Sequence, residues 1–303
     1  MSFPDPVKWA IPVFILLVVA EMVYGRLTGR VRFETRDTLA SLTMGLGNLV
    51  SGLAFGFLLL WAYDLAYAHR LFDIGYSWWA FLACFLAEDL AYYWFHRVSH
   101  ERRLFWASHV VHHSSQHYNL STALRQTWTG KLAFTFIFWI PLMLIGFPPA
   151  MVIFFSGLSL VYQFWIHTEA IGRMGPFEWI FNTPSHHRVH HATNPKYLDA
   201  NYAGVLIVWD RLFGSFVPED RAEPCEYGII KRLGTFNPLV IAFHEWVAMG
   251  RDALSARSLR GALGYLFGPP GWREDGTGRT VRVIKAELAA RQAEVSRVPA
   301  AAK

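Results

Sequence analysis

Long apolar runs separated by short polar segments dominate the first half of the chain. The runs cover residues 7–24, 39–61, 78–96, 131–145 and 150–167. A helix over 7–24 is about 27 Å long, which is close to the hydrocarbon thickness of a bilayer. No small-residue cleavage site follows this first run, so we expect an uncleaved membrane anchor and not a signal peptide. The pattern predicts an all-α integral membrane protein with four to five membrane helices.

The last two runs flank the tetrapeptide Gly146-Phe147-Pro148-Pro149. Proline lacks a backbone donor and stops a helix, so these runs are expected to form a helical pair with a sharp turn between them. The run 131–145 is short for a complete crossing, which leaves a re-entrant hairpin as an alternative to two spans.

The loop after the first run is rich in arginine, and such an excess is typical of the cytoplasmic side of a membrane. If the runs alternate across the bilayer, His96, His167 and the chain beyond His167 lie on that side too. We therefore expect a cytoplasmic helical cap, in a bacterial inner membrane or the endoplasmic reticulum. The arginines of this loop are Arg26, Arg30, Arg32 and Arg36.

The pattern divides the chain into three regions. Residues 1–76 are expected to form N-terminal anchor helices, and residues 77–217 a catalytic domain. Residues 218–303 hold amphipathic stretches with scattered arginine, which predict cytoplasmic helices on the membrane surface and a frayed tail.

Composition supports the membrane interpretation. The chain is 53% hydrophobic and only 17% charged, whereas a soluble domain carries about a quarter charged residues. A net charge of +5 is compatible with nucleic acid or with an anionic membrane surface, and the hydropathy favours the membrane. Cys84 and Cys225 are the only cysteines, so neither a disulfide framework nor a thiolate metal site is expected.

Ten of the 13 histidines lie in two short windows of the sequence. They form the patterns H-x3-H, H-x2-H-H and H-x2-H-H, and side chains three or four residues apart share one face of a helix. His167 ends the last apolar run. His186 directly precedes the third cluster and, on a helix, points about 100° away from it. The candidate ligands are His96, His100, His109, His112, His113, His187, His190 and His191, with His167 as a ninth and His186 as a weaker tenth.

So many imidazoles exceed what one metal ion can hold. We therefore expect two ions with four or five ligands each. Imidazole suits iron, zinc, copper and nickel. Hydrolytic metal pairs usually include bridging carboxylates, which are scarce beside these clusters, where Glu101 is the nearest. A histidine-only pair of iron ions can instead reduce O2 and oxidise a C–H bond. The zinc-protease pattern H-E-x-x-H fails, because Leu104 and Ala248 occupy the positions of the second histidine.

Longer strings around the histidines resemble the fatty acid hydroxylase/sterol desaturase superfamily, in particular its ether-lipid-cleaving members. Residues 89–126 read DLAYYWFHRVSHERRLFWASHVVHHSSQHYNLSTALRQ, and residues 167–216 include HTEAIGRMGPFEWIFNTPSHHRVHHATNP and NYAGVLIVWDRLFGSF. The likeness covers roughly residues 85–217, and Gln116-His117 departs from it where acidic residues are expected. The resemblance implies metal ligation by the eight cluster histidines, makes His167 and His186 plausible ligands, and adds Glu101 as a catalytic residue.

The resemblance also implies a reaction. It is the O2-dependent hydroxylation of a lipid C–H bond, such as the carbon next to the ether oxygen of an alkylglycerol. It would require two iron ions, a lipid from the bilayer, and an external reductant, either tetrahydrobiopterin or a small electron-donor protein. No flavin, haem or nicotinamide fingerprint is visible in the sequence.

Two alternatives remain open at this point. One is a sterol or fatty-acyl desaturase or hydroxylase of the same superfamily. The other is a membrane metal-binding or transport protein, although a transporter needs polar residues along several spans. Here the histidines gather at one end of the apolar runs.

Four polar residues near the clusters are candidates for support or for binding substrate or cofactor. Arg125 could hold a phosphate or a pterin, or reach the membrane interface. Asp210 could orient a ligand histidine through its free N–H, or cap a helix or form an ordinary ion pair. Asn119 and Asn201 flank the second and third clusters and complete this set.

Overall fold

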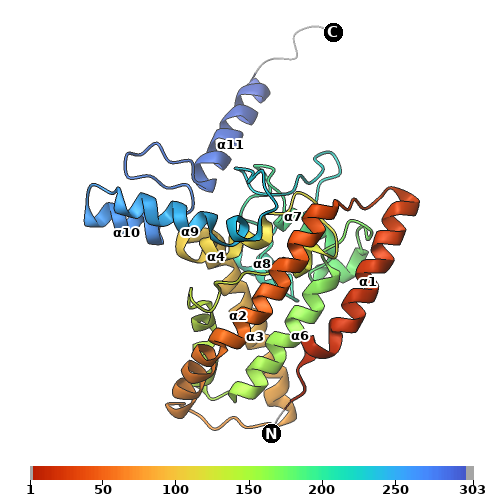
Figure 1. Ribbon diagram of the computed structural model, residues 1–303, viewed down its shortest axis with the longest axis vertical. Coiled ribbons are helices and arrows are strands. Elements are labelled where there is room, and N and C mark those ends of the chain that lie inside the picture. Colours follow the sequence, from red (N-terminus) through yellow and green to blue (C-terminus); the bar gives the residue numbers. More distant parts are fainter. Residues whose placement is uncertain (1–2, 298–303) are drawn as a thin grey trace.

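The computed structural model describes residues 3–297, and its regular elements in that range are helices and two isolated β-bridges. The all-helical prediction is confirmed. Four long helices lie side by side and form a bundle, and shorter helices and loops form a cap across one of its ends (Figure 1).

Helices α1 (Pro6–Thr28) and α2 (Thr35–Ala68) are long and apolar enough to cross a membrane. Only 11% of the most apolar window of α1 and 22% of that of α2 is buried in the protein. A core helix of a soluble protein would bury its apolar side chains, whereas these helices turn them outward, as lipid-facing helices do. Asp5 caps the start of α1 by accepting from two backbone N–H groups, and Gly29 ends the helix in the left-handed conformation.

Helices α3 (Trp78–Glu101) and α6 (Pro149–Trp165) complete the bundle, and α6 packs against both α1 and α3. Glu88 in the middle of α3 accepts hydrogen bonds from Trp139 and Ser156. Its neighbour Asp89 accepts from the backbone of Val205 and two further donors in the cap. These buried carboxylates therefore join α3 to the hairpin segment and to the cap.

The run 131–145 differs from the predicted long helix. It forms a short 3₁₀-helix η2 (Thr135–Trp139) and the helix α5 (Ile140–Ile145), which is only six residues long. Proline fits best in the first turn of an α-helix, where its missing N–H has no helical partner to lose, and Pro141 lies in the first turn of α5. The first member of the predicted pair is therefore not a spanning helix, and α5 instead packs against α2.

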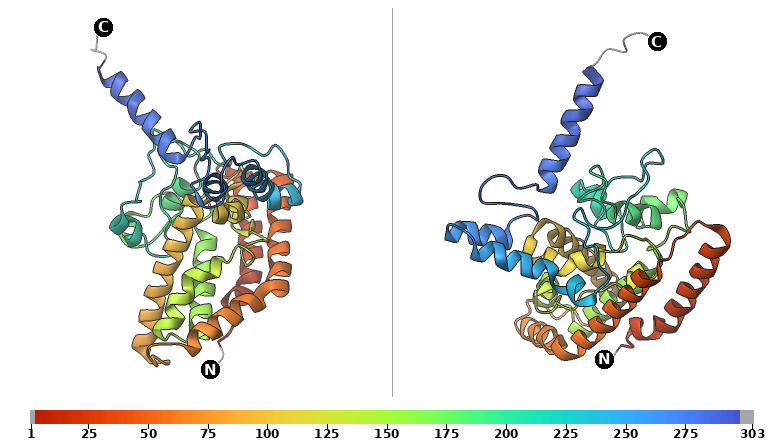
Figure 2. Two further views of the ribbon diagram at one scale, coloured as in Figure 1. Left: turned by 90° about the vertical axis from the view of Figure 1, so that its left-hand side faces the viewer. Right: turned by 45° about the horizontal axis from the view of Figure 1, so that its top comes forward.

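The cap contains α4 (Arg103–His113), η1 (Thr122–Leu124), η3 (Gly175–Trp179), α7 (Pro184–His190) and α8 (Val208–Phe213). A C-terminal layer follows. Helices α9 (Pro238–Leu254) and α10 (Leu259–Phe267) pack against α4 and against each other, and α11 (Val281–Arg297) projects away from the body (Figure 2).

The ends of α1, α3 and α6 and the start of α2 all reach the cap, as expected if consecutive runs alternate in direction (Figure 1). Glu21 near the end of α1 accepts from the backbone N–H of Leu120. Asn119 donates to the backbone oxygen of Arg32 between α1 and α2. The loop that follows the second histidine cluster is therefore tied to the first two helices.

Candidate metal centre

Nine histidines converge in the cap and form two groups, and within each group the potential ligand atoms lie within 4.8 Å of one another. Two of them lie at the end of α3 and three on α4. His167 is the second residue after α6, and the other three lie on α7 and directly after it. The first group is His96, His100, His109, His113 and His190, and the second is His112, His167, His187 and His191.

The groups do not coincide with the sequence clusters. His109 and His113, four residues apart on α4, face the first group, while His112 between them faces the second. His187 and His191 likewise belong to the second group, and His190 to the first. Each of these clusters therefore contributes to both groups, which ties the two groups into one centre.

Four of the nine rings donate their Nδ1–H to a backbone carbonyl. A carbonyl oxygen can only accept, so the proton of a neutral ring lies on Nδ1 and its Nε2 carries a bare lone pair. This arrangement is the usual one for histidines that ligate a metal through Nε2. The pairs are His96 with Tyr202 at 2.7 Å, His112 with Arg125 at 3.2 Å, His167 with Gln163 at 2.7 Å and His190 with Ala200 at 2.9 Å.

The bare nitrogens face one another. His112 Nε2 and His167 Nε2 lie 3.1 Å apart, although both rings already donate their single N–H to a carbonyl. Burial lowers the pKa of His112 to about 4 and that of His190 to about 3, so these rings are neutral near pH 7. Two lone pairs at that distance repel each other unless a cation lies between them. Among the described residues, the Nε2 atoms of His100 and His190 have no hydrogen-bond partner.

The donor set fits two transition-metal ions. An ion bound at about 2.1 Å with angles of 90–109° between ligands brings neighbouring nitrogens to roughly 3.0–3.4 Å. Within the groups, five pairs of Nε2 atoms lie 3.0–3.2 Å apart. Each group also offers four or more neutral imidazoles, the ligand type that suits iron, zinc, copper and nickel.

Asp210 does not contact a ligand histidine. Its carboxylate accepts from the backbone N–H groups of Tyr202 and Ala203 at 2.8 Å and from the Ser215 hydroxyl at 2.7 Å. The carbonyl of Tyr202 in turn accepts from His96. Asp210 therefore orients a ligand through one peptide group and not directly.

Arg125 is fully buried and is not free to bind a phosphate or a pterin. Its guanidinium pairs with Asp37 of α2 at 2.6 Å, and its carbonyl accepts from His112. Asn119 accepts from Ser121 as well as donating to the Arg32 carbonyl described above. Both predicted residues therefore shape the loop after the second cluster.

Asn201 adopts a left-handed backbone conformation with φ of 55°. Its side chain donates to the carbonyls of His186 and Val217 and accepts from the Val217 N–H. It therefore joins α7 to the segment that follows α8, and it forms no hydrogen bond with a ligand ring of the described residues.

Two predicted residues lie outside both groups. Glu101 pairs with Arg97 one helical turn earlier, at 2.9 Å. The His186 ring lies against Phe216 and 4.0 Å from Glu178, on another side of α7 from its neighbouring ligands. The structure thus brings nine of the ten candidate histidines together and leaves His186 apart.

Two supporting carboxylates were not predicted. Asp37 holds Arg125, and Asp199 lies 3.8 Å from Nδ1 of His100. Burial raises the pKa of Asp199 to about 7. A carboxylate in the first turn of an apolar helix is a weak signal that could have directed attention to Asp37.

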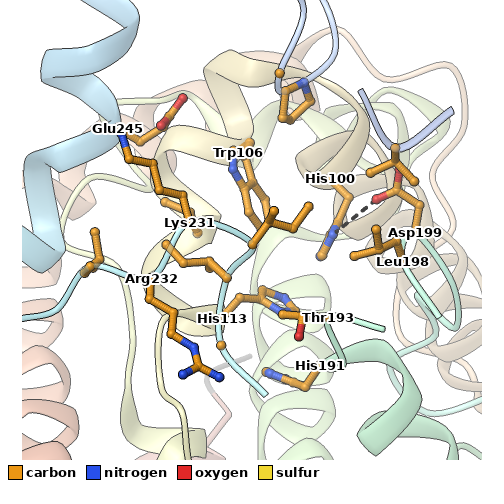
Figure 3. A pocket seen from close by; sticks show the side chains of 18 of the residues that line it. His100, Trp106, His113, His191, Thr193, Leu198, Asp199, Lys231, Arg232 and Glu245 are labelled. Atoms are coloured by element: carbon orange, nitrogen blue, oxygen red, sulfur yellow. Dashed lines mark ion pairs between the residues drawn. The ribbon is translucent and has the colours of Figure 1, made fainter. Parts of the chain in front are cut away.

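A cavity of about 490 Å³ opens from the metal centre. Its inner wall includes His100, His113, His190 and His191, and so reaches both histidine groups. Figure 3 shows His100, His113, His191 and Trp106, with Lys231 and Arg232 across the cavity from His100. Residues of α9 and the start of α11 complete the outer wall, so the C-terminal layer forms part of the site.

Comparisons with known proteins agree with this geometry. Residues 81–215 match the family model described as fatty acid hydroxylase. The human alkylglycerol monooxygenase is 41% identical over 272 residues, covering 89% of this chain and 60% of that protein. The Xenopus tropicalis alkylglycerol monooxygenase is 40% identical over 271 residues, with the same coverage. An ornithine lipid hydroxylase of Rhizobium tropici is 29% identical over 46% of the chain and 43% of that protein.

The chain thus spans about 60% of the length of the alkylglycerol monooxygenases it matches. No solved structure is significantly similar to it.

Proposed function

The chain belongs to the fatty acid hydroxylase family, and from this premise we propose that it is a membrane-bound di-iron monooxygenase that hydroxylates a lipid. The observation that carries the proposal is the convergence of nine buried histidines with facing, unprotonated Nε2 atoms. Converging, unprotonated imidazole nitrogens are metal-binding groups, and a purely structural core would have no use for them.

The first histidine group would hold one ion and the second group the other. Two iron ions bound there would supply the reduction of O2 and the oxidation of an unactivated C–H bond. The protein's own contribution is orientation. Backbone carbonyls fix the rings of His96, His112, His167 and His190, and Asp210 and the Asp37–Arg125 pair fix two of those carbonyls.

The cavity would bind the lipid with the reacting carbon at its inner wall. Trp106, Val110 and Leu233 give it apolar lining. One oxygen atom of O2 enters the C–H bond and the other leaves as water, with two electrons and two protons from outside the chain. The reductant would be tetrahydrobiopterin or a small electron-donor protein.

We further propose that the substrate is an alkylglycerol and that the reacting carbon is the one next to the ether oxygen. The support is the identity of about 40% to alkylglycerol monooxygenases over 89% of the chain. The hydroxylated product is a hemiacetal, which collapses to an aldehyde and a glycerol derivative.

The membrane placement follows from the exposed apolar surfaces of α1 and α2. We propose that these helices lie in the bilayer and that the cap lies on the cytoplasmic side, where the arginine-rich loop 26–36 belongs.

The test is lipid-dependent O2 consumption by the purified, iron-loaded full chain, supplied with tetrahydrobiopterin and, in a parallel assay, with a reduced small electron-donor protein, with aldehyde as the measured product. His190→Ala should abolish both, because it removes a ligand of the first group. His69→Ala is the matched control, since His69 lies at the end of α2 away from both groups and should leave turnover unchanged. The proposal is contradicted if His190→Ala retains turnover. It is also contradicted if the iron-loaded wild-type chain turns over none of the single-chain ether lipids tried.

A further inference from the structure

The outer wall of the cavity carries positive charge that no other described residue neutralises. Lys231 and Arg232 are consecutive, exposed residues of the loop before α9, and both line the cavity. Neither makes a hydrogen bond or an ion pair with any residue between 3 and 293. Leu233 anchors the loop by packing against the buried cluster that contains Val111 and Ile241.

The other charged residues that line the cavity already have partners. Glu245 pairs with Arg103 at 2.7 Å, and Arg279 pairs with Glu287 at 2.8 Å. Asp199 lies beside His100 at the metal centre, across the cavity from the loop (Figure 3). The two cations of the loop are therefore the charged lining residues that form no ion pair within the described part of the chain, while Glu245 shares Arg103 with Asp252.

The cations and the histidines occupy different parts of the cavity, and apolar side chains line both parts, including Ile230 and Leu233 on the loop that carries the cations. Trp106 and Val110 lie on α4, beside the histidines, while the two cations lie on the loop across from His100 (Figure 3). A ligand that fits this distribution has an apolar chain at the metal centre and an anionic group several bonds away. A single-chain ether lipid with a phosphate on its glycerol has both features.

The dimensions agree with such a ligand. Six bonds separate the alkyl carbon next to the ether oxygen from the phosphorus atom, which is about 7 Å in an extended chain. A spherical cavity of 490 Å³ is about 10 Å across. The reacting carbon can therefore lie at the histidines while the phosphate reaches the loop.

We propose that Lys231 and Arg232 form a headgroup site that selects single-chain ether lipids bearing a phosphate over neutral alkylglycerols. The inference rests on the proposed function only for the identity of the lipid chain. The recognition itself is a binding property of the cavity, so it can be measured without turnover.

The experiment measures binding of two lipids with the same alkyl chain, one with a glycerol and one with a glycerol phosphate headgroup. The iron-loaded full chain is kept without O2, and binding is followed by the fluorescence of Trp106 against a Trp106→Phe background control. The readout is the ratio of the two dissociation constants in the wild-type chain and in Lys231→Ala/Arg232→Ala. Exposed charge contacts are individually weak, so we expect the double variant to reduce the preference for phosphate by roughly tenfold.

The matched control is Arg251→Ala/Arg260→Ala. It removes two positive charges from the same C-terminal layer, at exposed positions that do not line the cavity. It should leave the ratio unchanged. The charge-reversed variant Lys231→Glu/Arg232→Glu should invert the preference. Glycerol phosphate without a chain is the competitor that distinguishes a lipid site from a general phosphate site, and it should compete at least tenfold more weakly than the lipid.

A preference for phosphate that is equal in the wild type and the double variant would overturn the proposal. So would a loss that the control variant reproduces. Lipid binding with the predicted preference but without turnover would leave the headgroup site standing and contradict the proposed reaction, so the two failures are distinguishable.

Discussion

The ion pair between Asp37 and Arg125 gives a sharp test of how the fold supports the second histidine group. Both side chains are buried, with 6% of the Asp37 side chain and 2% of the Arg125 side chain exposed, and they lie 2.6 Å apart. The Arg125 guanidinium also donates to the hydroxyls of Ser41 and Ser114, while its carbonyl accepts from His112. We predict that Asp37→Asn destabilises the protein and weakens binding of the second ion.

The magnitude follows from the burial. Removing one partner of a buried pair leaves an uncompensated charge and costs about 3–5 kcal/mol. Asparagine keeps one acceptor for Arg125, and two serine hydroxyls remain. We therefore expect the free energy of unfolding to fall by the lower end of this range, about 3 kcal/mol. Displacement of the Arg125 carbonyl disturbs the ring of His112, and losses at such supporting groups reduce metal affinity by about 10- to 100-fold.

The assay combines thermal unfolding in detergent with iron content after dialysis against a weak chelator. Asp64→Asn, at an exposed position of the same helix, is the matched control and should behave like the wild type. Asp37→Asn/Arg125→Met removes both charges and should recover most of the lost stability. The reasoning is refuted if Asp37→Asn binds two irons as tightly as the wild type and unfolds within about 0.5 kcal/mol of it.

Two further predictions concern stability. In the metal-free chain, burial lowers the pKa of His112 to about 4 and that of His190 to about 3, below the unfolded value of about 6.5. The unfolded chain then binds more protons as pH falls below about 6.5, so each of these rings removes about 1.4 kcal/mol of stability per pH unit until its folded pKa is reached. Thermal unfolding of chelator-treated protein between about pH 7.5 and pH 5.5 measures this slope, and a flat profile is the contrary result. Separately, a Cβ at Gly47 would overlap the Trp128 indole, whereas a Cβ at Gly56 meets open space. Gly47→Ala should cost roughly 1–3 kcal/mol and Gly56→Ala should be neutral or stabilising in thermal unfolding, and equal midpoints would show that Trp128 gives way.

The sequence identified the histidines that meet, because their spacing on helices and their position at the ends of apolar runs are local properties. It did not reveal how they divide between two groups. That division depends on which face of α4 and α7 each ring occupies in the folded cap, so His112 and His190 separate from their own neighbours. The structure places His186 outside both groups, and the helical rotation that separates it from His187 is a local property too.

Supporting residues were less accessible to prediction. Asp37 and Arg125 are 88 positions apart in the sequence and meet only because α2 packs beside the cap. Asp210 was singled out for the right reason, its proximity to a cluster, but it acts through the Tyr202 peptide, and no sequence pattern specifies which backbone group a carboxylate will bind.

Hydropathy has a similar limit in the segment 131–145. The apolar composition predicted a helix, but hydropathy does not distinguish an α-helix from apolar turns and a 3₁₀-helix. Pro141 and the left-handed Phe134 restrict the α-helix to six residues. The tail predicted to fray lies partly outside the described residues, and up to Arg297 it is helical.

The central claim is that nine histidines bind two metal ions in two groups. The most direct measurement is the iron content per chain of the purified protein, together with X-ray absorption at the iron edge. The account predicts two irons per chain with nitrogen ligands at about 2.1 Å and no sulfur ligand. His112→Ala and His109→Ala should each lower the content toward one, while His69→Ala keeps two. One iron per chain in the wild type, or two irons in both ligand variants, would contradict the account.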